Sequence, residues 1–551
     1  MSDVEINTAP SAEGSKLPAL SPGWDVHTVA LIAITTAGAL LRFSSLGRES
    51  LWYDEAFSAW YTTLSLSELW GQVPIYEVHP PLYGILLKAW TSVFGDSEAG
   101  LRSMSAIAGV MTIPLVYLLG RLAFGPGRGR ATGLFAAALA AFSPLHLMYG
   151  QEARPYALLT LAAVIAMCGA LWLAANPALA ARPWFGAAKT VAGWDIRPTA
   201  AWMALIFGCG LAVWSHNLGA LLLITLLVVV FPTILWNVKG SLPFIVNTIL
   251  AACAMVAIWS PFLPLLVIQT PTVKGHFWLK SISIGQFSHG MNHIFALHFP
   301  SWSFIYFVFA LAVAGLWTLG RERGFLAAYS LGGLFVVPLL IIVGVSHFFT
   351  PLFLPRTFIW ISMPFYVALA AGLNWANERF GGMRIPILAI TAFCFLWGDY
   401  RYFTLLTKEP WREMAIYLDK GGSSPNVALV ISGSAAIPLN YYSRRLNLKL
   451  DVRPLPVLFP APFLDRSYPW GVADPAIKSS DIGMVADLPC DTSTIWLVTR
   501  GGSIFDPESI IYNHLAGRCD LLEGHQRELI KIFRFGKKTP STDGAPGKKS
   551  P

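Results

Sequence analysis

The sequence Leu51-Trp52-Tyr53-Asp54-Glu55 places two adjacent carboxylates soon after the first long apolar run of the chain, residues 27–45. Acidic side chains are tolerated at the headgroup level of a bilayer but are costly inside the hydrocarbon. The pair therefore marks a place where the chain lies outside the membrane. In the simpler interpretation the carboxylates belong to a solvated loop; in the other they face a partner at the membrane surface. A second motif, His79-Pro80-Pro81-Leu82-Tyr83, follows in the same predicted loop.

The composition indicates an integral membrane protein. The chain has 551 residues, of which 55% are hydrophobic and 13% charged, whereas soluble domains usually carry about 25% charged residues. The net charge of +8 is spread over short loops and forms no basic stripe, which argues against a nucleic-acid partner. No Cys-x-x-Cys or His-Cys spacing predicts a metal site.

Apolar runs long enough to cross a bilayer predict an all-α membrane domain over residues 25–403, with 46–100 as its first outer loop. Residues 82–95 are shorter and favour a re-entrant or interfacial helix. We identify eleven spans, at about residues 27–45, 101–124, 130–148, 154–176, 200–216, 218–238, 244–268, 302–320, 324–345, 355–374 and 385–403.

The distribution of basic residues predicts the orientation of these spans. With eleven spans and a cytoplasmic N-terminus, the positive-inside rule is met by every basic loop. The loops that contain Asp54, Glu152, His216 and Arg356 then share the opposite side, as an extracytoplasmic active site requires. The cytoplasmic residues would be Arg121, Arg128, Arg130, Arg182, Lys189, Arg197, Lys239, Arg321, Arg323, Arg379 and Arg384.

The two ends of the chain differ from its centre. Residues 1–24 are polar and are predicted to be a disordered cytoplasmic N-terminus, and 537–551 a flexible tail. Residues 404–536 predict a small extracytoplasmic α/β domain, with strands at 427–431 and 494–498 and a helix at 409–420. An oxidising compartment would permit a disulfide between Cys490 and Cys519, which the sequence leaves open.

The outward residues suit a reaction on a lipid-linked phosphate. Guanidinium groups bind phosphate through two parallel hydrogen bonds, and a carboxylate can take the proton of a hydroxyl that attacks an anomeric carbon. Each residue also has a simpler structural interpretation. These are an interfacial pair for Glu152 and Arg154, a rigid turn for His79, a capping role for His216 and snorkelling for Arg356.

The order of the motifs resembles that of the GT-C membrane glycosyltransferases, in the group of protein O-mannosyltransferases and of lipid A aminoarabinose or galacturonosyl transferases. The resemblance covers nearly the whole chain, and relatives with thirteen spans widen the expected number to 11–13. The motifs are Trp52-Tyr53-Asp54-Glu55, His79-Pro80-Pro81-Leu82-Tyr83, Gln151-Glu152-Ala153-Arg154-Pro155-Tyr156, Ser215-His216-Asn217, Phe277-Trp278-Leu279, Pro355-Arg356, Trp411-Arg412 and Tyr441-Tyr442.

The resemblance implies an inverting transfer of a sugar from a polyprenyl-phosphate donor to a hydroxyl of a lipid, polysaccharide or protein, on the periplasmic side of the inner membrane. It assigns the catalytic base to Asp54 and makes Glu55 a neighbour that orients it or helps to hold a metal. Such enzymes differ in metal dependence, so a divalent metal stays open. The expected substrate-binding residues are His79, Tyr83, Glu152, Arg154, Tyr156, His216 and Arg356.

Two other functional classes make different predictions. A transporter or flippase of lipid-linked sugars would place ionisable residues near the midplane of its spans and is often built from internal repeats. The predicted spans are nearly free of charge and show no repeat, which disfavours it. An inactive scaffold would bind sugar lipids without turnover. The sequence favours the enzyme.

Overall fold

The computed structural model describes residues 25–537, with gaps at 78, 183–187, 191–192, 277–281, 296–301, 422–425, 463, 465, 470–472 and 528. The predicted disordered segment 1–24, residues 538–551 of the predicted tail and the motif Phe277-Trp278-Leu279 lie outside the described residues.

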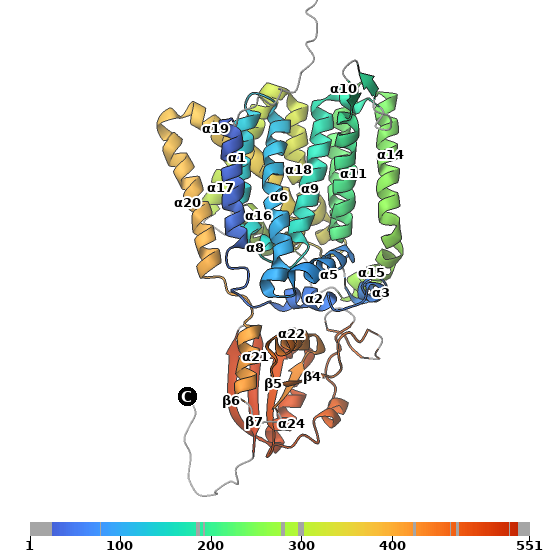
Figure 1. Cartoon of the computed structure of the whole chain (residues 1–551), viewed down its shortest axis with the longest axis vertical. Helices are drawn as coiled ribbons and strands as arrows, with labels where there is room; N and C mark the ends of the chain where they lie inside the picture. The colour runs from blue at the N-terminus through green and yellow to red at the C-terminus, as the bar shows by residue number, and fades with distance from the viewer. Residues whose placement is uncertain are drawn as a thin grey trace, which may run out of the picture.

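A bundle of long apolar helices makes up most of the molecule and confirms the predicted all-α membrane domain (Figure 1). Within the described part of the chain, nine segments are long and apolar enough to cross a bilayer. They are α1 (Val26–Phe43), α6 (Glu98–Phe124), α9 (Tyr156–Ala175), α11 (Arg197–Ser215), Asn217–Asn237 with α12 (Ala220–Thr225) and α13 (Phe231–Asn237), Leu242–Gln269 with α14 (Leu242–Trp259) and the start of α15 (Leu263–His276), α17 (Trp302–Arg323), α18 (Phe325–Phe348), and Ile359–Arg379 with α19 (Ser362–Arg379).

Against the 11–13 spans predicted, the described residues contain nine segments that are long and apolar enough to cross a bilayer, or ten if a bent pair is counted as one span. The predicted span 130–148 is broken into α7 (Gly129–Ala141) and α8 (Pro144–Gly150), which meet at 57°. Arg42 stabilises the break because its guanidinium donates to the carbonyls of Ala140 and Ala141, at 2.9 and 2.8 Å. The last predicted span, α20 (Arg384–Thr404), carries three charged residues and is not among the nine.

The first outer loop folds into short helices at the end of the bundle that faces the C-terminal domain (Figure 1). These are α2 (Tyr53–Tyr61), α3 (Leu66–Gly71), α4 (Val73–Tyr76) and α5 (Leu82–Phe94). Helix α5 has 13 residues, so it is too short to span. The remaining elements of the membrane part are α10 (Pro177–Ala180), the hairpin β1 (Ala188–Thr190) and β2 (Gly193–Asp195), and α16 (Ile284–Phe295).

The C-terminal domain is the predicted small α/β unit. Its sheet has the order β4-β3-β5-β7-β6, in which β3 is parallel to β4 and β5 while β7 is antiparallel to β5 and β6. The strands are β3 (Asn426–Ile431), β4 (Asp451–Leu455), β5 (Thr494–Arg500), β6 (Asp520–Arg527) and β7 (Ile530–Gly536), and the helices are α21 (Trp411–Lys420), α22 (Ala436–Leu446), α23 (Gly502–Phe505) and α24 (Ile510–Arg518). The predicted strands correspond to β3 and β5, and the predicted helix to α21.

The domain is stabilised by a disulfide within it and by hydrogen bonds to the first outer loop. Cys490 and Cys519 form a disulfide inside it, with their Cα atoms 5.6 Å apart. The domain is also bound to the start of the first outer loop. Ser50 donates to the carbonyl of Glu409 at 2.5 Å, and the amide of Leu51 donates to the Tyr442 hydroxyl at 2.6 Å. The loop is therefore enclosed between the bundle and the domain.

Candidate functional site

Helix α2 separates the two adjacent carboxylates of the first loop. Neighbouring residues of an α-helix point about 100° apart, so the side chains of Asp54 and Glu55 face different surroundings. The Asp54 side chain is 22% exposed, whereas that of Glu55 is completely buried. The two carboxylates therefore differ in what they can reach.

Glu55 is the anchor of α2. Its carboxylate receives two hydrogen bonds of 2.7 Å from Arg102 on α6, one of 2.9 Å from the amide of Ala153 and one of 3.1 Å from Lys408. Burial alone would raise the pKa of Glu55, but the charges of Arg102 and Lys408 lower it to about 2. The Glu55 carboxylate is thus ionised, and both of its oxygens accept hydrogen bonds from within the protein. This geometry favours a positioning role for Glu55 over the expected help in holding a metal.

Asp54 lies beside two arginines from distant parts of the chain. Arg356 Nη2 is 3.3 Å from Asp54 Oδ2, and Arg154 Nη1 donates to the Asp54 carbonyl at 3.3 Å. The guanidinium of Arg356 also lies over the rings of Trp52 and Tyr156, at 5.7 and 5.8 Å. The Nε atoms of both arginines are buried without a hydrogen-bond partner among the described residues. The site thus combines a partly exposed carboxylate with two cations that keep donor capacity.

Two histidines and a further carboxylate lie next to this group. His79 pairs with Glu77, and the rings of His79 and His216 meet edge to face with centroids 4.8 Å apart. Burial, together with the charges of His79 and Arg154, lowers the pKa of His216 well below its ordinary value. Its Nδ1 accepts from the amide of Leu218 at 3.0 Å, which is the capping role considered from the sequence. His216 is therefore held as a neutral ring.

Tyr83 is buried near His79. Its hydroxyl is 3.3 Å from that of Ser105. It shares the lining of a small cavity of about 30 Å³ with His79 and Arg154. Tyr83 therefore supports the site from within the protein.

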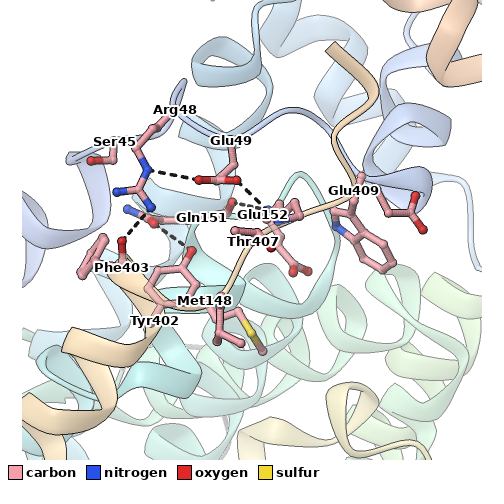
Figure 2. Close-up of a pocket in the computed structure, with 13 residues that line it drawn as sticks. Ser45, Arg48, Glu49, Met148, Gln151, Glu152, Tyr402, Phe403, Thr407 and Glu409 are labelled. Atoms are coloured by element: carbon pink, nitrogen blue, oxygen red, sulfur yellow. Dashed lines mark hydrogen bonds and ion pairs between the residues drawn. The ribbon is translucent and has the colours of Figure 1, made fainter. Parts of the chain in front are cut away.

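A larger cavity of about 350 Å³, which Trp52 helps to line, is shown in Figure 2. Glu152 lines it, is 7% exposed, and has an Oε2 atom without a hydrogen-bond partner in the described structure. Burial raises the pKa of Glu152 to about 7. The nearby positive charge of Lys408 lowers this pKa, whereas the negative charge of Glu55 raises it. The lining consists of Ser45, Arg48, Glu49, Trp52, Met148, Gln151, Glu152, Tyr402, Phe403, Leu406, Thr407, Lys408 and Glu409.

The structure thus brings the residues singled out in the sequence to one end of the bundle. Asp54, Arg154, Tyr156 and Arg356 form its centre, His79, Tyr83 and His216 one flank, and Glu152 the other. Among the residues that the structure describes, no group of three His, Cys, Asp or Glu side chains is arranged to hold a metal ion.

Sequence reasoning did not find Glu77, Arg102, Lys408 or Glu409 as parts of this site. Arg102 offered a signal, because it is a charged residue at the start of an apolar run. Lys408 and Glu409 offered none, because their partners on α2 lie far away in the sequence.

Comparison with known proteins yields one family match and several solved structures of similar fold. The family described as dolichyl-phosphate-mannose-protein mannosyltransferase matches residues 78–263. Comparison with curated proteins gave no match. Among solved structures, ArnT from Cupriavidus metallidurans aligns over 93% of this chain and 98% of its own, with 14% identity and a TM-score of 0.58.

Two further structures share the fold. ArnT from the same organism bound to undecaprenyl phosphate aligns over 94% of this chain and 100% of its own, with 15% identity and a TM-score of 0.56. The Archaeoglobus fulgidus oligosaccharyltransferase with a tethered acceptor peptide covers 87% of this chain and 69% of its own, with 13% identity and a TM-score of 0.51.

The chain therefore shares the fold of ArnT, a multi-span helical bundle with a small α/β domain next to its first outer loop. Residues 78–263, which contain the motifs His79-Pro80-Pro81 and Gln151-Glu152-Ala153-Arg154-Pro155-Tyr156, are the part of the chain that the mannosyltransferase family model matches.

Proposed function

We propose that this protein is an inverting glycosyltransferase that moves a sugar from a polyprenyl-phosphate donor to a hydroxyl acceptor. The observation that carries the proposal is the approach of Arg356 to within 3.3 Å of Asp54, with Arg154 beside them. A base for the acceptor and cations for the leaving phosphate are needed at the same place, since both act on one anomeric carbon.

The reaction would proceed by direct displacement. The acceptor oxygen attacks the anomeric carbon while Asp54 takes the hydroxyl proton. The bond from this carbon to the phosphate oxygen breaks, and its electron pair leaves with the polyprenyl phosphate. Arg356 and Arg154 bind the phosphate and stabilise the charge that develops on it. A single displacement inverts the configuration at the carbon.

The donor class is supported by the shared fold. ArnT, whose chain aligns along its full length with this one, has been solved bound to undecaprenyl phosphate. Tyr156 and Trp52 add aromatic surface beside the two arginines. We therefore place the donor phosphate at Arg356 and Arg154.

We place the acceptor in the large cavity beside Trp52. Three carboxylates line this cavity, from Glu49, Glu152 and Glu409. Of these, Glu152 has a buried Oε2 atom without a hydrogen-bond partner among the described residues, which can accept a hydrogen bond from a hydroxyl group. The apolar lining, from Met148, Phe403 and Leu406 among others, suits an amphipathic lipid or glycan acceptor.

The orientation follows from the positive-inside rule. Helix α10, next to Arg182, lies at the end of the bundle opposite the C-terminal domain (Figure 1). With the basic loops in the cytoplasm, the site and the C-terminal domain are on the periplasmic side of the inner membrane.

The proposal is tested by incubating the purified protein in detergent with labelled polyprenyl-phosphate sugars and an envelope extract. Transfer of the label from one donor to the extract, lost in Asp54→Asn, is expected. A folded protein that consumes no donor would leave the flippase alternative, which is measured by movement of the same lipids across liposomes.

A further inference from the structure

The linker between α20 and α21 inserts two adjacent residues of opposite charge against α2. Lys408 Nζ lies 3.1 Å from Glu55 Oε2 and 3.2 Å from the carbonyl oxygen of Gln151. Glu409 Oε2 accepts from the backbone amide of Tyr53 at 3.1 Å. The linker therefore holds the residue before Asp54 and the residue after it.

Glu409 is at the same time bound to the C-terminal domain. Its Oε1 atom receives two hydrogen bonds from Arg500 at the end of β5, of 3.0 and 2.8 Å. Its Oε2 atom also accepts from the indole of Trp411 at 2.7 Å, and Trp411 is fully buried in the domain. One buried carboxylate thus joins β5 and α21 to the first residue of α2.

A second tie runs through the Tyr53 side chain. The Arg500 guanidinium lies over the Tyr53 ring at 3.8 Å, and the Tyr53 hydroxyl is 2.5 Å from that of Ser434, in the turn that follows β3. Ser434 is in turn hydrogen bonded to the buried Asp474. The side chain and the main chain of Tyr53 are therefore both fixed by the C-terminal domain.

We propose that Lys408 and Glu409 are positioning residues through which the docked C-terminal domain sets the orientation of Asp54. The amide of a residue in the first turn of a helix has no partner within the helix, so a carboxylate that accepts from it also fixes the helix start, where negative charge is favourable. A base displaced by about 1 Å can lose roughly 100-fold in rate. This inference rests on the proposed role of Asp54 in transfer.

The test compares Glu409→Gln with Glu413→Gln in the full-length protein. Glu409→Gln keeps the shape of the side chain and removes its charge, whereas Glu413 is an exposed residue of α21 that is 4.0 Å from Arg412. Hydrogen exchange of the α2 amides should become faster in Glu409→Gln, with exchange in β3 and β5 unchanged. Turnover should fall about tenfold or more, with less than a twofold change in the KM for the donor. Glu413→Gln should match the wild type in hydrogen exchange, turnover and the KM for the donor.

Arg500→Lys tests the same contact from the other side. It keeps the positive charge but cannot form the two hydrogen bonds that Arg500 donates to Glu409. It should speed exchange in α2 in the same way, and combining it with Glu409→Gln should add little. Unchanged exchange in α2 would overturn the proposal, whether or not the wild type shows turnover. A parallel rise in exchange across β3 and β5 would do so too, because it would show that Glu409 only stabilises the domain. Turnover unaffected by faster exchange in α2 would equally contradict it.

Discussion

Arg356 Nη2 lies 3.3 Å from Asp54 Oδ2, so the proposed base is paired with a cation from a distant part of the sequence. The pair neutralises both groups where a donor phosphate and an acceptor hydroxyl are expected to meet. When the phosphate binds Arg356, we expect the Asp54 carboxylate to be released to face the acceptor. Donor binding and activation of the base are therefore coupled through one guanidinium.

Arg356 should contribute to donor binding through charge-assisted hydrogen bonds. Such a bond contributes about 1.5–3 kcal/mol, so Arg356→Gln should lower kcat/KM for the donor about tenfold or more. Arg356→Lys should recover only part of this, because an ammonium cannot form the paired hydrogen bonds. Steady-state kinetics against donor concentration measure both. Arg453→Gln, at an exposed ion pair in β4, is the control. An unchanged kcat/KM in Arg356→Gln would place the phosphate elsewhere.

Glu55 should matter for folding more than for chemistry. Glu55→Gln would leave Arg102 and Lys408 without their buried partner, and breaking a buried ion pair costs about 3–5 kcal/mol. We expect a clearly lower midpoint of thermal unfolding for this variant, and little change for Asp54→Asn, whose carboxylate is partly exposed. Equal midpoints for Glu55→Gln and the wild type, with activity lost, would instead assign Glu55 to the chemistry.

Glu152 should make stability depend on pH near neutrality. Its folded pKa of about 7 exceeds the ordinary 4.5, so between these values the folded protein binds more protons than the unfolded chain. Stability then falls as pH rises from 4.5 to 7, by about 3 kcal/mol at 1.36 kcal/mol per unit. Glu152→Gln does not titrate. Its unfolding midpoint relative to wild type should therefore be higher at pH 8 than at pH 5. A pH-independent difference would refute this.

The Cys490–Cys519 disulfide should stabilise the C-terminal domain. It closes a loop of 29 residues, for which the loss of chain entropy in the unfolded state predicts about 3–4 kcal/mol. Replacing both cysteines by serine should raise hydrogen exchange in β5 and α24 while the helices of the bundle stay protected. The membrane-embedded Cys168→Ser is the matched control. Equal exchange with and without the disulfide would show that the hydrophobic core stabilises the domain without the disulfide.

The sequence allowed the membrane architecture to be predicted because burial in lipid leaves long apolar runs. The break between α7 and α8 was missed because Arg42, which stabilises it, lies on another helix. Helix α20 was counted as a span because its apolar stretch outweighed its charged residues. The order of the sheet depends on contacts between distant strands, which periodicity within one strand does not reveal.

The sequence singled out residues that the structure brings together, but it did not reveal how they pair. Adjacency made Asp54 and Glu55 look like one acidic pair, and only the turn of α2 shows that they face different surroundings. The pairing of Asp54 with Arg356 depends on how the outer loops meet. Lys408 and Glu409 looked like ordinary charges before a soluble helix, since nothing local indicates that they contact α2.

The most direct test of the central claim is the rate of sugar transfer from a labelled polyprenyl-phosphate sugar to an envelope extract, measured for wild type and Asp54→Asn at equal amounts of folded protein. We predict transfer by the wild type and a loss of about 100-fold or more in the variant, as expected when a general base is removed. Retained transfer in Asp54→Asn would contradict the account.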